Sequence, residues 1–227
     1  MGLRGLTAGK PAADYRRDRR RLVRQLRSRG VQDVALLDAF DRVPRHLFVS
    51  SVLRDRAYED VPLPIGAGQT ISSPTIHALS IEAAAVGPGR RVLEVGTGTG
   101  FQTALLATLG ADIHSIERIA SLHEAAGAAL ARFGVEARLM LGDGSLGWPE
   151  HAPFDAIIVG AAAARPPAAL LEQLADGGRM IVPLGTRRQH LYRYTRRGDD
   201  VDRVKITRVR FVPLIVERRR GRGWPRP

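Results

Sequence analysis

The residues best suited to chemistry begin at Glu94, where the sequence reads Glu-Val-Gly-Thr-Gly-Thr-Gly. Glycines at alternate positions let a backbone turn sharply and approach a ligand closely, and a helix beginning just beyond them presents unpaired N–H groups. The spacing differs from the G-x-G-x-x-G of dinucleotide-binding proteins. An acidic residue just before the first glycine disfavours a pyrophosphate and suits a cationic ligand. S-adenosyl-L-methionine, with its ammonium and sulfonium, fits this pattern; the alternative is a tight turn without a ligand.

Two further acidic residues stand at the ends of expected strands. Glu117 ends the strand expected at residues 112–117, where a carboxylate can accept hydrogen bonds from both hydroxyls of a ribose. Asp143 follows the next strand and can accept from an adenine amino group, while Gly142 and Gly144 leave room for the ring. The alternatives are a solvated glutamate and a simple turn. All of these residues lie at the carboxyl ends of strands, where open α/β sheets bind ligands.

Other chemistries find little support in the residue types. The chain has no cysteine, which excludes disulfides and thiolate catalysis, and its six histidines include no pair at metal-ligand spacing, so we expect no metal. Ser72 lacks the G-x-S-x-G context of an activated nucleophile and is better interpreted as a hydroxyl donor. His77 enters an apolar helix from an apolar loop, where it could contact a substrate or simply pack.

These residues need a sheet to position them, and the hydrophobic pattern predicts one. From residue 76 onward apolar strands alternate with helices, which implies right-handed crossovers and a parallel sheet covered on both faces. Two β runs with no helix between them end the pattern, which predicts an antiparallel C-terminal hairpin. The fold class is therefore α/β, with a Rossmann-like, mostly parallel sheet of seven strands. Strands are expected at 91–95, 112–117, 137–141, 154–159, 179–184, 190–195 and 206–214, helices at 13–29, 34–40, 76–86, 102–109, 122–133 and 167–174, and an ordered loop at 57–75.

The charge is unusual but unevenly spread. The chain has 227 residues and a net charge of +12. Residues 1–60 carry a net +6, residues 61–186 a net −4 and residues 187–227 a net +10. Because the expected chemistry lies in the acidic middle, we predict that the charge does not describe the active site. With no apolar run long enough to cross a membrane and no signal-type stretch, we expect a cytoplasmic protein without a membrane partner.

At the level of longer motifs the chain resembles the protein-L-isoaspartate O-methyltransferases. The segment AYEDVPLPIGAGQTISSP carries the most diagnostic part, GQTIS followed by a proline. Phe101 stands where bacterial members usually have Tyr, and Gly160 where many have Thr. The resemblance covers roughly residues 35–215. Its other segments, in chain order, are RVPRHLFV, VLEVGTGTGFQTALLA, IERI, GDGSLGW, APFDAIIVGAAA, LLEQLADGGRMIVPLG and VRFVPL.

This resemblance implies a class I methyltransferase that moves a methyl group from S-adenosyl-L-methionine to the α-carboxylate of L-isoaspartyl residues in damaged proteins and peptides. By resemblance Ser72 is the catalytic residue and holds the carboxylate, Thr70 and Ile71 line the acceptor site with His77, and Val212 in the last strand meets the substrate peptide. The residues expected to contact the cofactor are Glu94, Gly96, Thr97, Gly98, Gly100, Glu117, Arg118, Gly142, Asp143 and Gly144.

Alternatives to this function remain open. A related methyltransferase could act on aspartate of one dedicated peptide. A nucleic-acid-binding protein on the same fold would use the basic ends, but those ends hold few aromatic residues to stack bases, so nucleic acid is a poor candidate. We expect a monomer, with an N-terminal helical segment and substrate loop at 1–75, a methyltransferase domain at 76–216 and a basic, disordered tail at 217–227.

Overall fold

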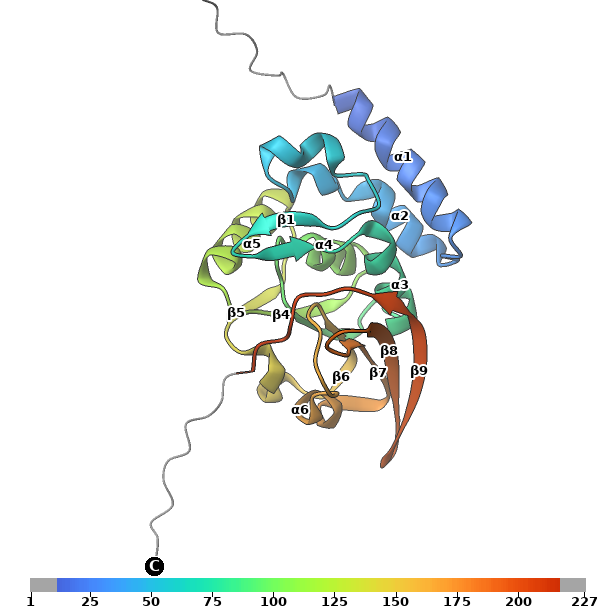
Figure 1. The fold of residues 1–227 in the computed structure, drawn as a ribbon, viewed down its shortest axis with the longest axis vertical. Coiled ribbons are helices and arrows are strands. Elements are labelled where there is room, and N and C mark those ends of the chain that lie inside the picture. Colours follow the sequence, from blue (N-terminus) through green and yellow to red (C-terminus); the bar gives the residue numbers. More distant parts are fainter. Residues whose placement is uncertain (1–11, 217–227) are drawn as a thin grey trace, which may run out of the picture.

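The computed structural model describes residues 12–216, and within that range seven strands form one sheet in the order β5-β4-β3-β6-β7-β8-β9 (Figure 1). The pairs from β5 across to β7 are parallel, whereas β7 to β8 and β8 to β9 are antiparallel. The predicted fold class is confirmed. The strands of this sheet are β3 (Arg91–Val95), β4 (Asp112–Glu117), β5 (Arg138–Leu141), β6 (Phe154–Val159), β7 (Leu174–Leu184), β8 (Gln189–Arg197) and β9 (Asp200–Val209).

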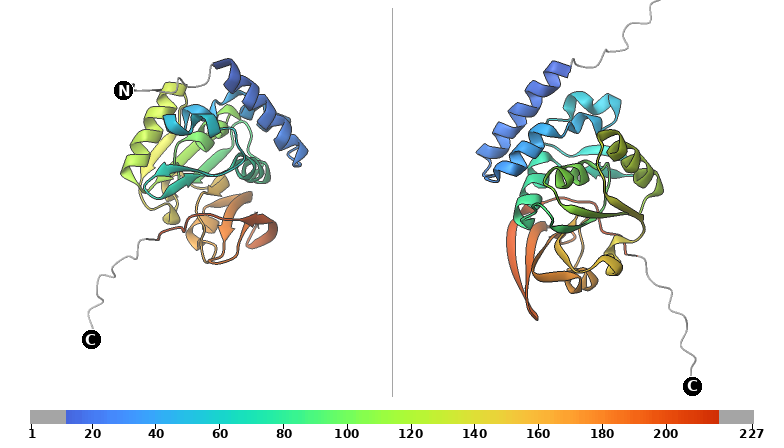
Figure 2. Two further views of the ribbon diagram at one scale, coloured as in Figure 1. Left: turned by 45° about the horizontal axis from the view of Figure 1, so that its top comes forward. Right: turned by 180° about the vertical axis from the view of Figure 1, so that it is seen from behind.

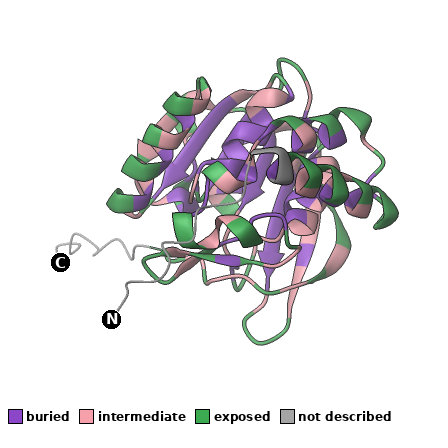
Figure 3. Ribbon diagram, turned by 90° about the horizontal axis from the view of Figure 1, so that it is seen from above, coloured by how far each residue is buried: buried purple, intermediate pink, exposed green. Residues whose placement is uncertain are grey.

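The central strands are buried on both faces, as expected for parallel strands covered by helices. Because successive side chains of a strand point to opposite faces, neighbouring residues join different hydrophobic clusters: Val92 and Ile158 belong to one, Leu93 and Ile157 to the other. Figure 3 shows these strands buried between exposed helices. The α-helices are α1 (Ala12–Ser28), α2 (Val34–Arg42), α3 (Pro74–Ala84), α4 (Phe101–Thr108), α5 (Ala120–Phe133) and α6 (Ala168–Glu172), with 3₁₀ turns at Arg45–Leu47, Ser51–Arg56, Gly144–Leu146 and Pro149–His151.

The N-terminal helices α1 and α2 pack on α3 and α4, which cover one face of the sheet. Tyr15, Leu22 and Leu26 of α1 are buried in the same cluster as Val92 and Ile158, so the chain before residue 76 shares a core with the sheet. α1 lies along the outside of this layer (Figures 1 and 2). The division at residue 75 stays a prediction. The tail expected at 217–227 lies outside the described residues.

The segment expected as a loop at 57–75 contains a small antiparallel hairpin. It pairs β1 (Leu63–Gly66) with β2 (Gln69–Ile71). Ala67 and Gly68 form its turn with positive φ angles of 49° and 69°. Strands of three and four residues are too short to show the alternation that predicts a strand from sequence. The hairpin presents Thr70 and Ser72 toward the sheet edge described below.

The C-terminal strand ends earlier than expected, which corrects the prediction for Val212. β9 stops at Val209, and the following residues leave the sheet instead of extending it to 214. There the Val212 carbonyl accepts a hydrogen bond from Ala162 N at 2.8 Å. The side-chain amide of Gln189 donates to the Phe211 carbonyl at 3.2 Å and accepts from Phe211 N at 2.6 Å. These contacts carry the chain back over the carboxyl ends of the parallel strands.

Candidate active site

The site begins at the carboxyl ends of the neighbouring strands β3 and β6. β3 pairs with β4 on one side and β6 on the other, so chain connections leave in opposite directions and open a crevice at the carboxyl ends of these strands. Gly96 follows β3 with φ 96°, and Gly160 follows β6. A Cβ at Gly160 would lie 3.2 Å from the Val95 carbonyl oxygen. The two glycines therefore keep the strand ends close and the crevice floor free of side chains.

The glycines of the glycine loop serve two different structural purposes. Gly96, Gly98 and Gly100 all have positive φ angles, of 96°, 57° and 82°. Gly96 and Gly98 line the crevice, as expected for residues that a ligand approaches closely. Gly100 does not line it: a Cβ there would lie 3.0 Å from Leu130 Cγ, so its glycine serves the packing of α4 on α5.

Glu117 ties the end of β4 to the glycine loop. One carboxylate oxygen accepts a hydrogen bond from Gly98 N at 2.9 Å, and the other accepts from Ile119 N at 3.0 Å. Each carboxylate oxygen has two lone pairs, so both oxygens can accept a further hydrogen bond from a ligand. Glu117 and Arg118 line a cavity of about 680 Å³ along this edge of the sheet, here called the edge cavity.

Asp143 lies across the edge cavity from the glycine loop, after β5. One of its carboxylate oxygens accepts from Ser145 N at 2.9 Å, which fixes the turn that follows. A Cβ at Gly144 would lie 2.5 Å from Val95 Cγ1, so this glycine is required by packing against β3 as well as by the cavity it lines. Gly142 is not part of the lining; its N–H donates to the Glu117 carbonyl at 2.9 Å.

Glu94 lies deeper, fully buried beneath the loop. Its carboxylate accepts hydrogen bonds from Gln102 Nε2 at 2.9 Å, Thr103 Oγ1 at 2.5 Å and Ser115 Oγ at 2.7 Å. Thr97, a predicted cofactor contact, shares a 2.7 Å hydrogen bond with the same Ser115 hydroxyl. Burial raises the pKa of Glu94 to about 7, although the three donors act in the opposite direction.

A second cavity, of about 500 Å³ and here called the inner cavity, continues from the first toward His77. His77 Nδ1 lies 3.0 Å from Gln102 Oε1. Since Gln102 donates its amide to Glu94, its oxygen faces the ring, which assigns the proton to Nδ1 and leaves Nε2 as an acceptor. Burial and the nearby Arg45 lower the pKa of His77 to about 3, so the ring is neutral. Nε2 is buried and has no hydrogen-bond partner within residues 12–216.

Ser72 lies where the inner cavity meets a third hollow, here called the outer groove. Thr70 and Gly160 border both cavities and the groove, while Val212 lines the edge cavity and the groove. Ile71, expected beside the acceptor, is buried and lines the inner cavity only. The structure thus brings predicted acceptor and cofactor residues together in one crevice: the inner cavity and the edge cavity are each lined by members of both sets.

Sequence reasoning missed Arg45, whose side chain holds the backbone of Ser72 in place. Arg45 is fully buried; its Nη2 donates to the Ser72 carbonyl at 2.7 Å and its Nε to the Ala57 carbonyl at 2.8 Å. Its guanidinium stands 4.8 Å over the centre of the Phe101 ring. Burial lowers the pKa of Arg45 to about 9. The available signal was the place of Arg45 in the RVPRHLF segment, between Val43 and Phe48.

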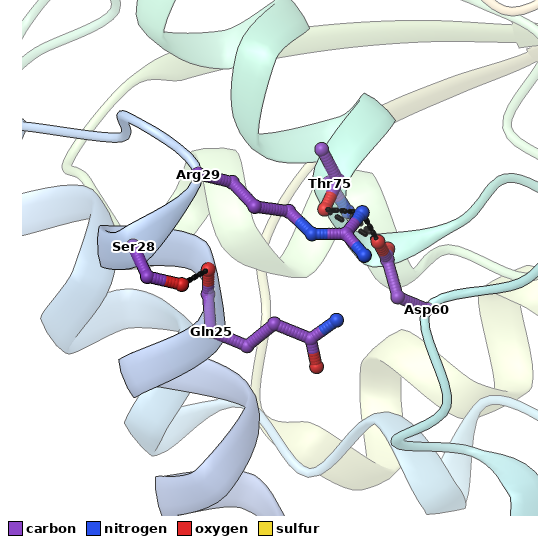
Figure 4. A network of polar contacts seen from close by, with 5 residues as sticks. All are labelled: Gln25, Ser28, Arg29, Asp60 and Thr75. Carbon is purple, nitrogen blue, oxygen red and sulfur yellow. Dashed lines mark hydrogen bonds and ion pairs between the residues drawn. The ribbon is translucent and has the colours of Figure 1, made fainter.

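A second support fixes the first turn of α3, directly after Ser72. Asp60 accepts hydrogen bonds from Thr75 N at 2.8 Å and Thr75 Oγ1 at 2.7 Å, and it pairs with Arg29 at the end of α1 (Figure 4). Ser73, the residue at the N-cap position, makes no side-chain cap. Asp60 therefore satisfies the exposed N–H group that a capping side chain usually takes.

Within residues 12–216 no group of three or more His, Cys, Asp or Glu side chains could hold a metal ion. None of the helices in this range is long and apolar enough to cross a membrane.

Comparison with known proteins decides the family. Residues 17–219 match the family model of protein-L-isoaspartate(D-aspartate) O-methyltransferases. The chain belongs to this family. It is 55% identical over 198 residues to the protein-L-isoaspartate O-methyltransferase of Methylorubrum populi, covering 86% of this chain and 93% of that one. It is 50% identical over 224 residues to that of Methylorubrum extorquens, covering 97% and 96%.

Solved structures agree. A protein-L-isoaspartate O-methyltransferase superposes with a TM-score of 0.79 at 30% identity, over 86% of this chain and 65% of that one, so the chain spans about two thirds of that protein's length. The Plasmodium falciparum protein-L-isoaspartate O-methyltransferase, solved in complex with S-adenosyl-L-homocysteine, superposes with a TM-score of 0.76 at 26% identity, over 87% and 98%. Family membership confirms the expected methyltransferase activity on L-isoaspartyl sites and the expected cofactor, S-adenosyl-L-methionine.

The edge cavity suits this cofactor. Glu117 keeps free lone pairs for two ribose hydroxyls, while Ile116, Ile119 and Leu122 supply an apolar wall for a flat ring. Gly96 leaves the backbone open to close approach, and the acidic Glu94 lies beneath the loop, where a cation is favoured. The acceptor oxygens, the apolar wall and the open glycine backbone therefore fit an adenosine joined to a cationic amino acid.

Proposed function

We propose that the edge cavity and the inner cavity together hold S-adenosyl-L-methionine, and that the outer groove presents an isoaspartyl carboxylate to it. Glu117 would accept from the ribose hydroxyls, Asp143 would meet the adenine amino group, and Glu94 would favour the cationic end. The observation that carries the proposal is the position of Ser72, which borders the inner cavity and the outer groove at once. A carboxylate held there can reach from the groove into the inner cavity.

The methyl transfer needs little acid–base catalysis. The acceptor carboxylate has a pKa near ~4 and is ionised at neutral pH, so no strong general base is needed. This agrees with His77, whose low pKa of about 3 keeps it neutral. When bound, the cofactor supplies an electrophilic methyl group on its sulfonium. The chain would contribute orientation, through the Ser72 hydroxyl on one carboxylate oxygen, and exclusion of water by Ile76 and Phe211.

We further propose that the substrates are damaged proteins in general. The segment after β9 passes beside the groove with its backbone held by Gln189, so an extended peptide could pair with main-chain groups there and be accepted with little side-chain selection. The methyl ester would then cyclise to a succinimide without the enzyme and reopen partly to normal aspartate. A monomeric, cytoplasmic protein is the corresponding expectation.

The decisive experiment measures methyl transfer from labelled cofactor to an isoaspartyl peptide and to the same peptide with normal aspartate. We expect labelling of the isoaspartyl form alone; equal labelling of both, or none, would refute the proposal. Labelling of one peptide sequence and no other isoaspartyl peptide would favour a dedicated substrate. Ser72→Ala should lower kcat by about tenfold to 100-fold, since it removes one hydrogen bond to a charged group, while Ser72→Thr keeps the hydroxyl. Ser51→Ala, exposed and outside the site, is the matched control.

Nucleic acid stays a poor second candidate. Single-strand binding relies on exposed aromatic rings that stack bases. In the N-terminal basic region, Tyr15, Phe40, Phe48 and Tyr58 are buried. Tyr194 in the C-terminal basic region is buried as well. A salt-steep affinity for RNA or DNA that survives removal of residues 217–227 would revive this alternative.

A further inference from the structure

The charged side chains that line the outer groove are all positive. Arg208 and Arg210 line it, and among the described residues no acidic side chain does. The sequence placed these arginines in a basic end remote from the acidic middle of the chain. The structure instead brings that end to the site, because residues 210–214 turn back over the sheet edge. The expectation that the charge does not describe the active site is therefore wrong for these two residues.

The two arginines are held in a defined place. Arg208 pairs with His190 in the β8–β9 register, and Arg210 is the first residue after the end of β9. Both arginines line the outer groove. Gln189 clamps the backbone of Phe211 directly beyond them. Both arginines are exposed, and neither forms an ion pair with another residue in the range 12–216. Their charges are available to a ligand in the groove.

The position of these cations indicates which part of a peptide they meet. Ser72, Thr70 and Phe211 line the inner cavity as well as the groove, whereas Arg208 and Arg210 line the groove alone. A carboxylate that reaches the inner cavity has passed beyond the arginines. The residues beside it in the peptide chain remain in the groove, next to the two guanidinium groups.

We propose that the outer groove selects isoaspartyl sites flanked by acidic residues, with Arg208 and Arg210 as the specificity-determining pair. This inference rests on the proposed function and names its preferred substrate class. Guanidinium groups pair well with carboxylates in a forked geometry, and a lysine flank would meet two like charges. Because both arginines are exposed, the preference should weaken as added salt screens it.

The test compares three isoaspartyl peptides that differ only in whether their flanking residues are Asp and Glu, Ser and Ala, or Lys. For the unaltered enzyme at low salt we expect kcat/KM to be about tenfold higher for the acidic than for the basic flank, from two exposed ion pairs. The doubly reversed variant Arg208→Glu/Arg210→Glu should invert this order, and the readout is the ratio of kcat/KM for the acidic flank to that for the basic flank.

The matched control is Arg203→Glu/Lys205→Glu, which makes the same change of charge at exposed residues of β9 that line neither cavity nor the groove. It should keep the original order. Equal rates for the three flanks in the unaltered enzyme, or an equal loss for all three in the Arg208/Arg210 variant, would overturn the inference. Failure of the proposed function is distinguishable, because the neutral isoaspartyl peptide would then not be methylated at all.

Discussion

The edge cavity and the outer groove meet at Ser72, yet they are built in different ways. The edge cavity is largely made by residues between 95 and 161 that lie at or just after the carboxyl ends of β3, β4, β5 and β6. The groove joins residues 62–76 to residues 208–212, which are far apart in the chain. The first depends on the register of a parallel sheet, and the second on long-range clamps by Arg45, Asp60 and Gln189.

Their charges differ as well. Glu117 and Asp143 outnumber Arg118 in the lining of the edge cavity, and Glu94 lies deeper in the crevice, which suits a cationic cofactor. Arg208 and Arg210 line the groove, which suits an anionic peptide. Two oppositely charged compartments side by side can each favour their own ligand. Changes confined to one compartment should therefore alter one binding constant and leave the other unchanged.

The largest effect is expected in the edge cavity, from Glu117→Gln. The amide can no longer accept from both Gly98 N and Ile119 N while also accepting from a ribose. Cofactor affinity should fall by about 100-fold, since hydrogen bonds to a charged group are lost. Calorimetric titration with S-adenosyl-L-methionine measures it. The peptide KM should not change, and Glu124→Gln, exposed on α5, is the control. An unchanged cofactor affinity would contradict the ribose role.

The next effect belongs to the groove. Arg45→Met keeps most of the buried volume but leaves the carbonyls of Ser72 and Ala57 without their donor. Ser72 should lose its fixed position, and kcat/KM for an isoaspartyl peptide should fall by about 30-fold, equivalent to ~2 kcal/mol. Cofactor affinity should stay within about twofold, which separates a positioning role from general misfolding.

Two comparisons keep the Arg45 result interpretable. Arg56→Met, exposed and paired with Glu59, should leave both constants unchanged. Arg45→Lys restores a cation and should recover part of the activity if the Ser72 carbonyl is what matters. A parallel loss of cofactor affinity in Arg45→Met would show that the two compartments are not independent.

The same contrast explains what the sequence could predict. β3, β4 and β6 were predicted to the residue, because their short stretches with β-branched apolar residues end at a glycine or a charge. The place of Glu117 in the site was predicted from its position at the end of a strand. Arg45 and Asp60 could not be predicted, since their partners are backbone groups 27 and 15 residues away that only the folded chain brings close. Arg210 was misplaced because a strand that ends at Val209 and turns back has the same apolar pattern as one that continues.

A smaller effect tests the buried carboxylate that lies between the compartments. Burial raises the pKa of Glu94 from 4.5 to about 7, so in the free protein the carboxyl takes up a proton as the pH falls through 7. A cationic cofactor favours the ionised form. Cofactor affinity should therefore weaken by about tenfold between pH 7 and pH 5.5.

Glu94→Gln should remove most of this pH dependence. S-adenosyl-L-homocysteine, which lacks the sulfonium charge, should show a weaker dependence than the cofactor in the unaltered protein. The same pKa shift has a second consequence: the free energy of unfolding should fall as the pH rises from 4.5 to about 7, because the native state keeps a proton that the unfolded chain releases. Identical pH profiles for the variant and the unaltered protein would exclude Glu94 as their cause.

The smallest effect is expected at Arg29, the exposed partner of Asp60. Arg29 pairs with Asp60, but its side chain is 48% exposed, whereas that of Asp60 is 5% exposed (Figure 4). Asp60 keeps both hydrogen bonds to Thr75 without Arg29. Arg29→Ala should therefore lower the free energy of unfolding by only about 0.5 kcal/mol in urea titrations and raise the peptide KM by no more than about twofold. Arg27→Ala, at an exposed position of α1 two residues before Arg29, is the control. A loss above about 2 kcal/mol would mean that the groove depends on α1 as strongly as on Arg45, and that its support extends to the N-terminal helix.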